Sequence, residues 1–256
     1  LKHQPQVFET LKPTYKYSYS KKEISKYKKF SNIRVIGMGG SILGTEAIYD
    51  FLKKKIKKKI TFVNNLNSNA DYFQDKNINL NLIISKSGNT LETIVNANTL
   101  IKSKENNIVI TEKKDSYLTN LASQLKAEIF EHKNYVGGRY SVLSEVGMLP
   151  AELMNLNESK FKQFNTLIKN KAFVNNLVNN VATTLNLIKN GKYTSIILNY
   201  DEHSENLFKW YQQLIAESLG KKSKGILPIV SSMPKDNHSL MQLYLDGPKK
   251  SFYTFF

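Results

Sequence analysis

The chain has 256 residues, 41% of them hydrophobic, and its formal net charge at pH 7 is +16. This length suits one large domain or two modest ones, and the hydrophobic share excludes an intrinsically disordered chain. The lack of cysteine excludes disulfides and thiolate metal sites and fits a reducing compartment. No apolar run reaches bilayer-spanning length, and the N-terminus lacks the apolar core of a signal peptide. We therefore expect a cytoplasmic protein without membrane contact.

The large basic excess makes nucleic acid one partner class to consider. The densest basic run, residues 53–59, follows an expected helix, where lysines suit the negative end of the helix dipole. The sequence contains no recognised nucleic-acid-binding module, so a basic nucleic-acid binder is kept only as an alternative. We expect no nucleic-acid partner, because a basic surface equally favours the arrival of a phosphate ester.

Short β-branched runs alternate with helical patterns through the first half of the chain. We expect strands at residues 33–36, 60–63, 80–85, 108–110 and 128–130. Ile94, Ala97 and Ile101 share one face of an expected helix, and Asp115 or Ser116 is placed to cap the next one. Strand and helix in alternation predict an α/β fold, with a parallel sheet flanked by helices on both faces.

The second half repeats this alternation on a smaller scale. The pattern is helical from about 157 to 190, and Gly191 supplies the expected end signal. Strands are expected at 195–198 and 225–230, with a helix from about 205 to 219 between them. We predict a second domain of the same type, with only three strand candidates.

We place the first domain at residues 1–155 and the second, partial domain at 156–256. The chain begins with Leu1 and closes on the apolar, aromatic run 251–256, whereas natural termini are more often polar and frayed. We therefore expect a chain cut at both ends, with the second domain truncated.

A glycine-rich segment at residues 36–44, I-G-M-G-G-S-I-L-G, joins an expected strand to a helix. Backbone N–H groups in such a turn can reach a phosphate, which makes Gly40 and Ser41 candidates for phosphate binding. The segment is not the dinucleotide fingerprint, because the third glycine would fall at Ile42. Nor is it a P-loop, since no Lys-Ser or Lys-Thr closes it. Alone it is equally typical of a tight strand-to-helix turn.

A second strand-to-helix turn, residues 85–93, reads S-K-S-G-N-T-L-E-T. Ser85, Ser87 and Thr90 offer three hydroxyls around the turn, with Lys86 beside them. A phosphate needs several donors that converge from a helix N-terminus, and ligands of α/β sheets bind at such strand ends. An ordinary Ser/Thr helix cap is the alternative, but four polar groups and a glycine in six residues favour a phosphate site.

These two turns resemble those of the sugar-isomerase domain, a phosphosugar-binding α/β module. A third motif, V-G-G-R-Y-S-V-L-S-E-V-G at residues 136–147, is close to a signature of the phosphoglucose isomerase family. In isolation Gly138-Arg139 would be a flexible turn with a solvent-exposed arginine. In this context Arg139 resembles an arginine held at a site.

Two further motifs extend the resemblance to the phosphoglucose isomerase family. Residues 210–221 read W-Y-Q-Q-L-I-A-E-S-L-G-K, in which Glu217 resembles the family's catalytic base. Gln213 lies four residues earlier and shares its helix face. Residues 237–247 read N-H-S-L-M-Q-L-Y-L-D-G, and here His238 resembles the family's ring-opening histidine. The remaining histidines match no motif: His3, His132 and His203.

The resemblance covers residue 33 to the end of the chain, with its motifs in the family's order. It implies reversible isomerisation of glucose 6-phosphate and fructose 6-phosphate through a cis-enediol, a step of glycolysis and gluconeogenesis. Glu217 would act as the base, Arg139 would stabilise the enediolate, and His238 would open the sugar ring. Glu92 would orient His238 without touching the substrate. The remaining expected site residues bind the phosphate or the sugar: Gly40, Ser41, Ser85, Lys86, Ser87, Thr90, Gly138 and Gln213.

The resemblance further implies no cofactor and no metal, and a homodimer in which the neighbouring subunit supplies the histidine of a shared active site. Family members continue beyond the position of Phe256 and carry there a lysine and a glutamine that have no counterpart here. Two alternatives stay open. One is a sugar-phosphate-sensing regulator that binds without turnover. The other is a bifunctional phosphoglucose/phosphomannose isomerase, because pocket shape rather than these motifs reads the stereochemistry at C2.

Overall fold

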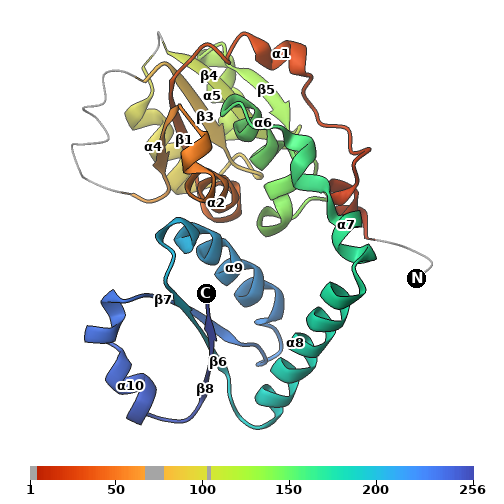
Figure 1. Cartoon of the computed structure of the whole chain (residues 1–256). Coiled ribbons are helices and arrows are strands. Elements are labelled where there is room, and N and C mark those ends of the chain that lie inside the picture. The colour runs from red at the N-terminus through yellow and green to blue at the C-terminus, as the bar shows by residue number, and fades with distance from the viewer. Residues whose placement is uncertain (1–4, 67–77, 103–104) are drawn as a thin grey trace. The chain divides into compact units, whose positions relative to one another are not determined.

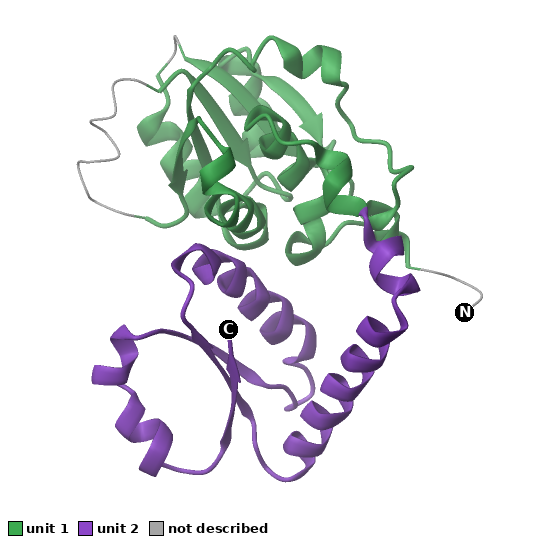
Figure 2. Ribbon diagram, viewed as in Figure 1, with its two compact units in different colours: residues 1–162 green, residues 163–256 purple. Residues whose placement is uncertain are grey.

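The computed structural model describes residues 5–66, 78–102 and 105–256, which form two compact units, Leu1–Lys162 and Gln163–Phe256 (Figure 2). The first unit extends past residue 155 because the short 3-10 helix η5 (Glu158–Lys162) packs onto its N-terminal segment. The ammonium of Lys162 lies 4.5 and 4.4 Å from the ring centres of Tyr15 and Tyr17. These cation–π contacts tie the end of η5 to the first unit.

The first unit is built on one parallel sheet whose strands follow the order β2-β1-β3-β4-β5 (Figure 1). The five strands are β1 (Asn32–Gly37), β2 (Lys59–Val63), β3 (Leu80–Ile84), β4 (Asn106–Thr111) and β5 (Glu128–Glu131). All five coincide with the expected strands to within two residues at each end. The predicted parallel α/β architecture is therefore confirmed for this unit.

Helices cover both faces of this sheet, as the near-continuous apolar strands require. On one face Val35, Leu82 and Ile110 join a core with α2 (Leu43–Phe51) and α6 (Glu145–Leu153), and the short α1 (Lys21–Ser25) also contributes. On the other face Ile83 and Val109 pack with α4 (Leu91–Leu100) and α5 (Tyr117–Gln124). Successive strand residues thus alternate between two buried cores.

Serine caps mark where several helices of this unit begin. The Ser116 hydroxyl accepts a hydrogen bond from the Thr119 N–H at the start of α5, while the Thr119 side chain accepts from the Ser116 N–H. Ser20 and Ser144 cap α1 and α6. Side-chain oxygens at these positions satisfy N–H groups that have no partner inside the helix. Of the two candidates expected from the sequence, Ser116 is the cap.

The second unit holds a smaller parallel sheet with the strand order β7-β6-β8. Its strands are β6 (Thr194–Asn199), β7 (Leu227–Ser232) and β8 (Ser251–Phe255), and its helices are α7 (Phe164–Lys169), α8 (Lys171–Lys189), α9 (Glu205–Leu219) and α10 (Met241–Asp246). This second, smaller parallel sheet confirms the two-sheet α/β fold class.

The stretch expected to be helical from 157 to 190 is not one helix. It divides into η5, α7 and α8. The break between α7 and α8 falls at Asn170, whose side chain accepts from the Phe173 N–H and begins α8. Asn competes with helix continuation in this way wherever its side chain reaches a backbone donor. The expected end of the stretch is confirmed, since Gly191 has a left-handed φ of +77° directly after α8.

Candidate active site

The candidate phosphate-binding turns leave the sheet of the first unit side by side. β1 and β3 are neighbouring parallel strands, and the glycine-rich segment follows β1 while the serine-rich turn follows β3. From β1 the chain continues to β2 on one side, and from β3 it continues to β4 on the other. Such a reversal of strand order is where open α/β sheets bind ligands, outside the carboxyl ends of the strands.

Two motifs a hundred residues apart pack directly on each other through glycine. The 3-10 helices η2 (Gly39–Ser41) and η4 (Gly138–Leu143) carry them. A Cβ added to Gly40 would lie 2.1 Å from the Gly138 carbonyl carbon and 2.6 Å from the Arg139 nitrogen. The Ser141 hydroxyl lies 3.1 Å from the Gly40 carbonyl and 2.7 Å from the Gly138 carbonyl. The structure therefore brings Gly40 and Gly138 together, and places the Arg139 backbone against the glycine-rich segment.

The serine-rich turn is organised by hydrogen bonds within itself. The buried Ser85 hydroxyl accepts from the Gly88 N–H at 3.2 Å and pairs with the Thr90 hydroxyl at 2.9 Å. Thr90 precedes α4 but does not cap it with its side chain. Ser87 is exposed and accepts from the Asn89 N–H. Ser85 and Thr90 thus meet as expected, with Thr90 at the N-terminus of α4.

The turn is also held from outside by the start of α5. Gly88 has a φ of +70°, and a Cβ there would lie 2.2 Å from the Ser116 hydroxyl. The Asn89 side-chain oxygen accepts from the Tyr117 N–H at 2.9 Å, so a residue of the turn satisfies a first-turn donor of α5. Sequence reasoning did not single out Asn89, because this contact joins residues 28 positions apart.

Lys86 points its ammonium at the segment that precedes Arg139. Its Nζ donates to the Asn134 carbonyl at 2.7 Å and lies 3.7 Å from a carboxylate oxygen of Glu112. Arg139 itself is half-buried, and its guanidinium carbon lies 4.4 Å from the ring centre of Tyr140. This stacking on an exposed aromatic ring restricts where the guanidinium can point.

The second unit carries the other expected catalytic residues. Gln213 and Glu217 lie one turn apart on α9, with Glu217 exposed in the last turn of the helix and Gln213 half-buried. The Gln213 side-chain oxygen is buried and has no hydrogen-bond partner among the described residues. The neighbouring Gln212 donates instead to the Pro228 carbonyl of β7 at 2.9 Å, which anchors α9 to the small sheet.

His238 is exposed at the end of the 3-10 helix η7 (Lys235–His238), which follows β7. Asp236 holds this loop: one of its carboxylate oxygens accepts from the Ser231 hydroxyl and the Ser232 N–H, both at 2.8 Å. The other oxygen accepts from the Ser239 hydroxyl at 3.2 Å. The hydrogen bond from Ser231 is the largest cause of the lowered pKa of Asp236. Sequence reasoning missed Asp236, although an aspartate two residues before the histidine and among serines was a usable signal.

The expected orientation of His238 by Glu92 pairs residues of different units, since Glu92 lies on α4 of the first. It stays a prediction.

His132, which matched no motif, is 1% exposed, and burial is the largest cause of its lowered pKa. In the described ranges, no three His, Asp or Glu side chains are placed to hold a metal ion. Across the same ranges, no helix is both long and apolar enough to cross a membrane.

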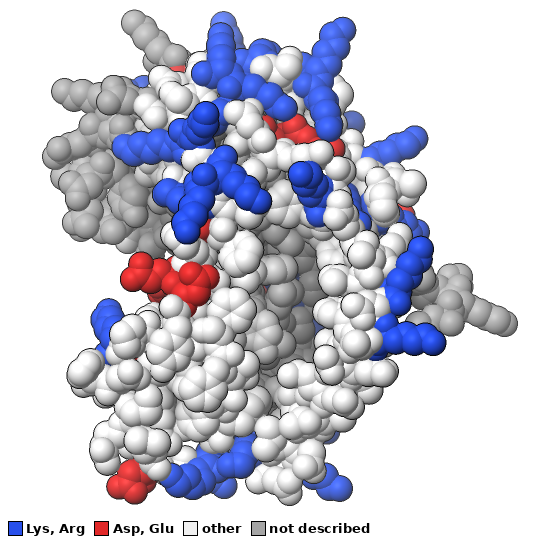
Figure 3. Space-filling model, in the orientation of Figure 1, with Lys and Arg blue, Asp and Glu red and all other residues white. Residues whose placement is uncertain are grey.

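Two adjoining cavities of about 610 and 500 Å³ open at the carboxyl ends of β4 and β5, beside the serine-rich turn. They share Glu112, Lys113, Lys114 and Glu131, and none of the expected site residues lines them. On the face drawn in Figure 3, most lysine and arginine side chains gather in the upper part of the view, with some acidic groups among them.

Comparison with known proteins points to one family. Residues 17–230 match the family model of phosphoglucose isomerase. Glucose-6-phosphate isomerase of Methanocaldococcus jannaschii is 38% identical over 91% of this chain and 62% of its own length. The enzyme of the same name from Mycoplasmopsis synoviae is 33% identical over 92% of this chain and 63% of its own length. The chain thus spans about three fifths of the length of these curated relatives.

Solved structures share the fold at lower identity. A hypothetical protein from Thermus thermophilus superposes with a TM-score of 0.76 at 23% identity, over 98% of this chain and 64% of its own. Tagatose-6-phosphate ketose/aldose isomerase from Escherichia coli superposes with a TM-score of 0.64 at 14% identity, over 98% of this chain and 71% of its own.

Proposed function

Because this chain belongs to the phosphoglucose isomerase family, we propose that it interconverts glucose 6-phosphate and fructose 6-phosphate. The contact between Gly40 and Gly138 is the observation that carries the proposal, because it joins the phosphate-binding region to the segment of Arg139. The whole protein's reaction would be an aldose–ketose isomerisation of glycolysis and gluconeogenesis, with no cofactor.

The phosphate would bind outside the carboxyl ends of β1 and β3. Ser41 with the backbone at Gly40 approaches it from one side, and the serine-rich turn approaches it from the other. The exposed Ser87, and Thr90 at the N-terminus of α4, offer hydroxyl donors, and the first turn of α4 adds backbone N–H groups. Ser85 supports Thr90 through their 2.9 Å hydrogen bond, and the charge of Lys86 attracts the phosphate at long range.

The proton transfer would be carried by Glu217. Its carboxylate takes the proton from C2 of the open-chain aldose, the hydroxyl proton on the C2 oxygen passes to the C1 oxygen, and the resulting carboxyl returns a proton to C1. The cis-enediolate formed between these steps carries negative charge on oxygen. Arg139 would stabilise that charge, since a guanidinium is always protonated in proteins and its attraction to an anion is stronger where water is excluded. Gln213, one turn from Glu217, would hydrogen-bond the sugar.

The sugar arrives as a closed ring, so an acid–base group must open it first. His238 would exchange the proton between the ring oxygen and the anomeric hydroxyl, and Glu92 would orient its ring. We further propose a homodimer with a shared site to which the neighbouring subunit contributes this histidine, and a cytoplasmic location. The absence of cysteine from the sequence is consistent with that compartment.

The test is the conversion of fructose 6-phosphate to glucose 6-phosphate by the full-length protein and by Glu217→Gln. Gln keeps the shape of the side chain but cannot take a proton, so we expect kcat to fall by about 10²-fold or more. Glu205→Gln, at the other end of α9, is the matched control and should stay within about twofold, as surface substitutions usually do. Full activity of Glu217→Gln would show that another group is the base.

A second arm separates the alternatives. A regulator that only senses sugar phosphate would bind glucose 6-phosphate by calorimetry, yet neither the wild type nor Glu217→Gln would turn it over. A bifunctional isomerase would also convert mannose 6-phosphate, with a loss in Glu217→Gln equal to that for glucose 6-phosphate.

A further inference from the structure

Lys86 lies in the serine-rich turn, but its contacts lie elsewhere. Its ammonium donates a hydrogen bond to the Asn134 carbonyl at 2.7 Å and lies 3.7 Å from a carboxylate oxygen of Glu112. Asn134 belongs to the segment between β5 and η4, five residues before Arg139. The side chain of Lys86 therefore spans from the proposed phosphate turn to the chain that presents the proposed catalytic arginine.

The carboxylate beside Lys86 is itself fixed and ionised. Glu112 lies 2.5 Å from the Lys114 ammonium, and its side chain is only 15% exposed. Burial would raise the pKa of Glu112, but the hydrogen bond to Lys114 and the charges of Lys114 and Lys86 lower it overall. Glu112 is thus an anion at neutral pH, placed to hold the ammonium where it is.

The backbone repeats the same connection. The Glu112 N–H donates to the Lys86 carbonyl at 3.1 Å, and the Thr111 hydroxyl lies 3.4 Å from that carbonyl. Both ends of Lys86 are therefore attached to chain outside its own turn. A side chain so attached shifts together with its turn, which is how a local change passes to a neighbouring element.

We propose that Lys86 is a positioning residue that couples phosphate binding at the serine-rich turn to the segment carrying Arg139. The coupling rests on the proposed phosphate-binding role of the turn. When phosphate orders the turn, the Lys86 bridge orders residues 134–140, so binding energy from the remote phosphate is used to place Arg139 for the enediolate. Under this proposal the ammonium acts through the Asn134 carbonyl and not as a direct phosphate ligand.

Amide hydrogen exchange of Val136 and Tyr140 reports on that segment, because their N–H groups donate to Lys133 and Gly137 at 3.0 and 2.9 Å. In the full-length wild type we expect saturating inorganic phosphate to slow both amides by about threefold or more, as local opening becomes costlier. In Lys86→Met the two amides should exchange faster and should no longer respond to phosphate. Lys86→Arg, which keeps a cation and its donors, should restore most of the response.

Lys113→Met is the matched control, since it removes an exposed lysine that lines the adjoining cavities without touching the bridge. It should keep the phosphate response, and its phosphate affinity measures the loss of charge alone. Calorimetry with inorganic phosphate should give Lys86→Met an affinity within about threefold of Lys113→Met, because only long-range charge is lost in both. A loss of about tenfold or more beyond Lys113→Met would make Lys86 a direct ligand and overturn the proposal.

The proposal that Lys86 couples the two segments would also be overturned by an unchanged phosphate response of the Val136 and Tyr140 amides in Lys86→Met.

Failure of the proposed function gives a different result, because the wild type then binds neither inorganic phosphate nor glucose 6-phosphate. The bridge itself would still be visible then, as faster exchange of both amides in Lys86→Met without any ligand.

Discussion

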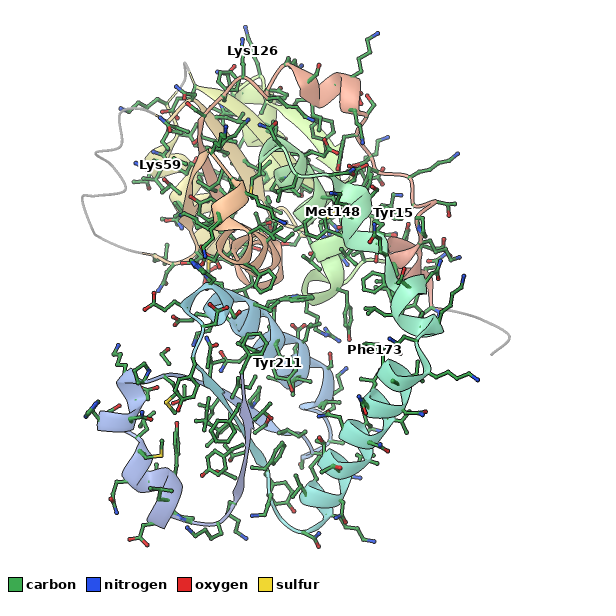
Figure 4. All side chains as sticks on the ribbon, viewed as in Figure 1. Tyr15, Lys59, Lys126, Met148, Phe173 and Tyr211 are labelled. Carbon is green, nitrogen blue, oxygen red and sulfur yellow. The ribbon has the colours of Figure 1, made fainter. Side chains whose placement is uncertain are left out.

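The two units of this chain use the same parallel α/β plan with very different burial. In the first, every residue of β3 is buried, and helices pack against both faces of the sheet. In the second, none of the helices α7, α8, α9 and α10 has a buried residue, and its buried cluster consists of Ile196, Leu198 and Met233 among the described residues. Figure 4 labels Met148 in the first unit and Phe173 on α8 in the second. Met148 is fully buried, whereas Phe173 is 40% exposed.

The contrast separates the two halves of the proposed chemistry. The proposed phosphate-binding turns and Arg139 stand on a tightly packed sheet and on close glycine contacts. Glu217 and His238 stand on exposed elements, where local hydrogen bonds such as those of Asp236 keep the loop in place. Under the proposed function, phosphate binding would rest on the packed part of the chain and proton transfer on the less buried part, and substitutions can test this division.

Deleting core volume in the first unit should have the largest effect. Leu82 on β3 is fully buried, so Leu82→Ala removes packed methylenes and leaves a cavity. We expect a loss of about 3 kcal/mol or more in the free energy of unfolding, measured by urea denaturation. Leu177→Ala on α8 is the control: its side chain is 54% exposed and should cost no more than about 0.5 kcal/mol. Equal losses would mean that α8 is packed as tightly as the first core.

The glycine contact should be nearly as sensitive. Gly40→Ala places a methyl group against the backbone of Gly138 and Arg139, which cannot move aside as a flexible side chain would. Overpacking of this kind should cost about 2–3 kcal/mol in thermal or urea unfolding. A methyl group on Gly138 would approach only the Gly40 Cα, at 3.9 Å, so Gly138→Ala should be tolerated far better. Comparable losses in the two variants would contradict the close approach at Gly40.

A buried carboxyl makes the first unit sensitive to pH. Glu46 is 4% exposed, and burial raises its pKa to about 7 from a reference of 4.5. The folded state binds the proton of the Glu46 carboxyl more tightly than the unfolded state does. The stability that this protonation adds to the folded state is therefore fully present below about pH 4.5 and is lost as the pH rises through 7. Glu46→Gln should therefore stabilise the protein at pH 8 by about 2 kcal/mol and change little at pH 4.

Urea unfolding at the two pH values measures this difference. Glu131→Gln, at an exposed position of β5, is the control for replacing a surface carboxylate by an amide. A Glu46→Gln variant that is destabilised equally at pH 4 and pH 8 would show that the carboxylate is not penalised by burial.

The smallest effect on stability is expected in the second unit. Asp236→Asn weakens the hydrogen bonds from Ser231 and Ser232 and should cost about 1 kcal/mol, because the loop is partly exposed. The consequence should instead be local, as broadened NMR signals of the His238 ring and slower turnover. Asp246→Asn at an exposed position of α10 serves as the control. An unchanged His238 spectrum in Asp236→Asn would separate Asp236 from the placement of this histidine.

Much of the fold was predictable because its signals are local. Apolar runs, helical spacing and single turn residues such as Ser116 and Gly191 depend on a few neighbouring positions. They located the strands of both sheets and several helix ends. The same kind of signal misled at Asn170, where a side-chain cap interrupts a pattern that is otherwise helical. The order of motifs along the chain was enough to indicate the family.

The sequence by itself determined the alternation of strands and helices, the two-sheet plan and the positions of the motifs, because these depend on periodicity and residue type. Only the tertiary structure decided the strand order β2-β1-β3-β4-β5, the packing of Gly40 on Gly138, the attachment of Lys86 to Asn134, and the burial of Glu46. Each of these joins residues distant in sequence or depends on what covers a helix face. Such contacts form only when the whole sheet assembles, since the residues involved carry no local preference for their partners.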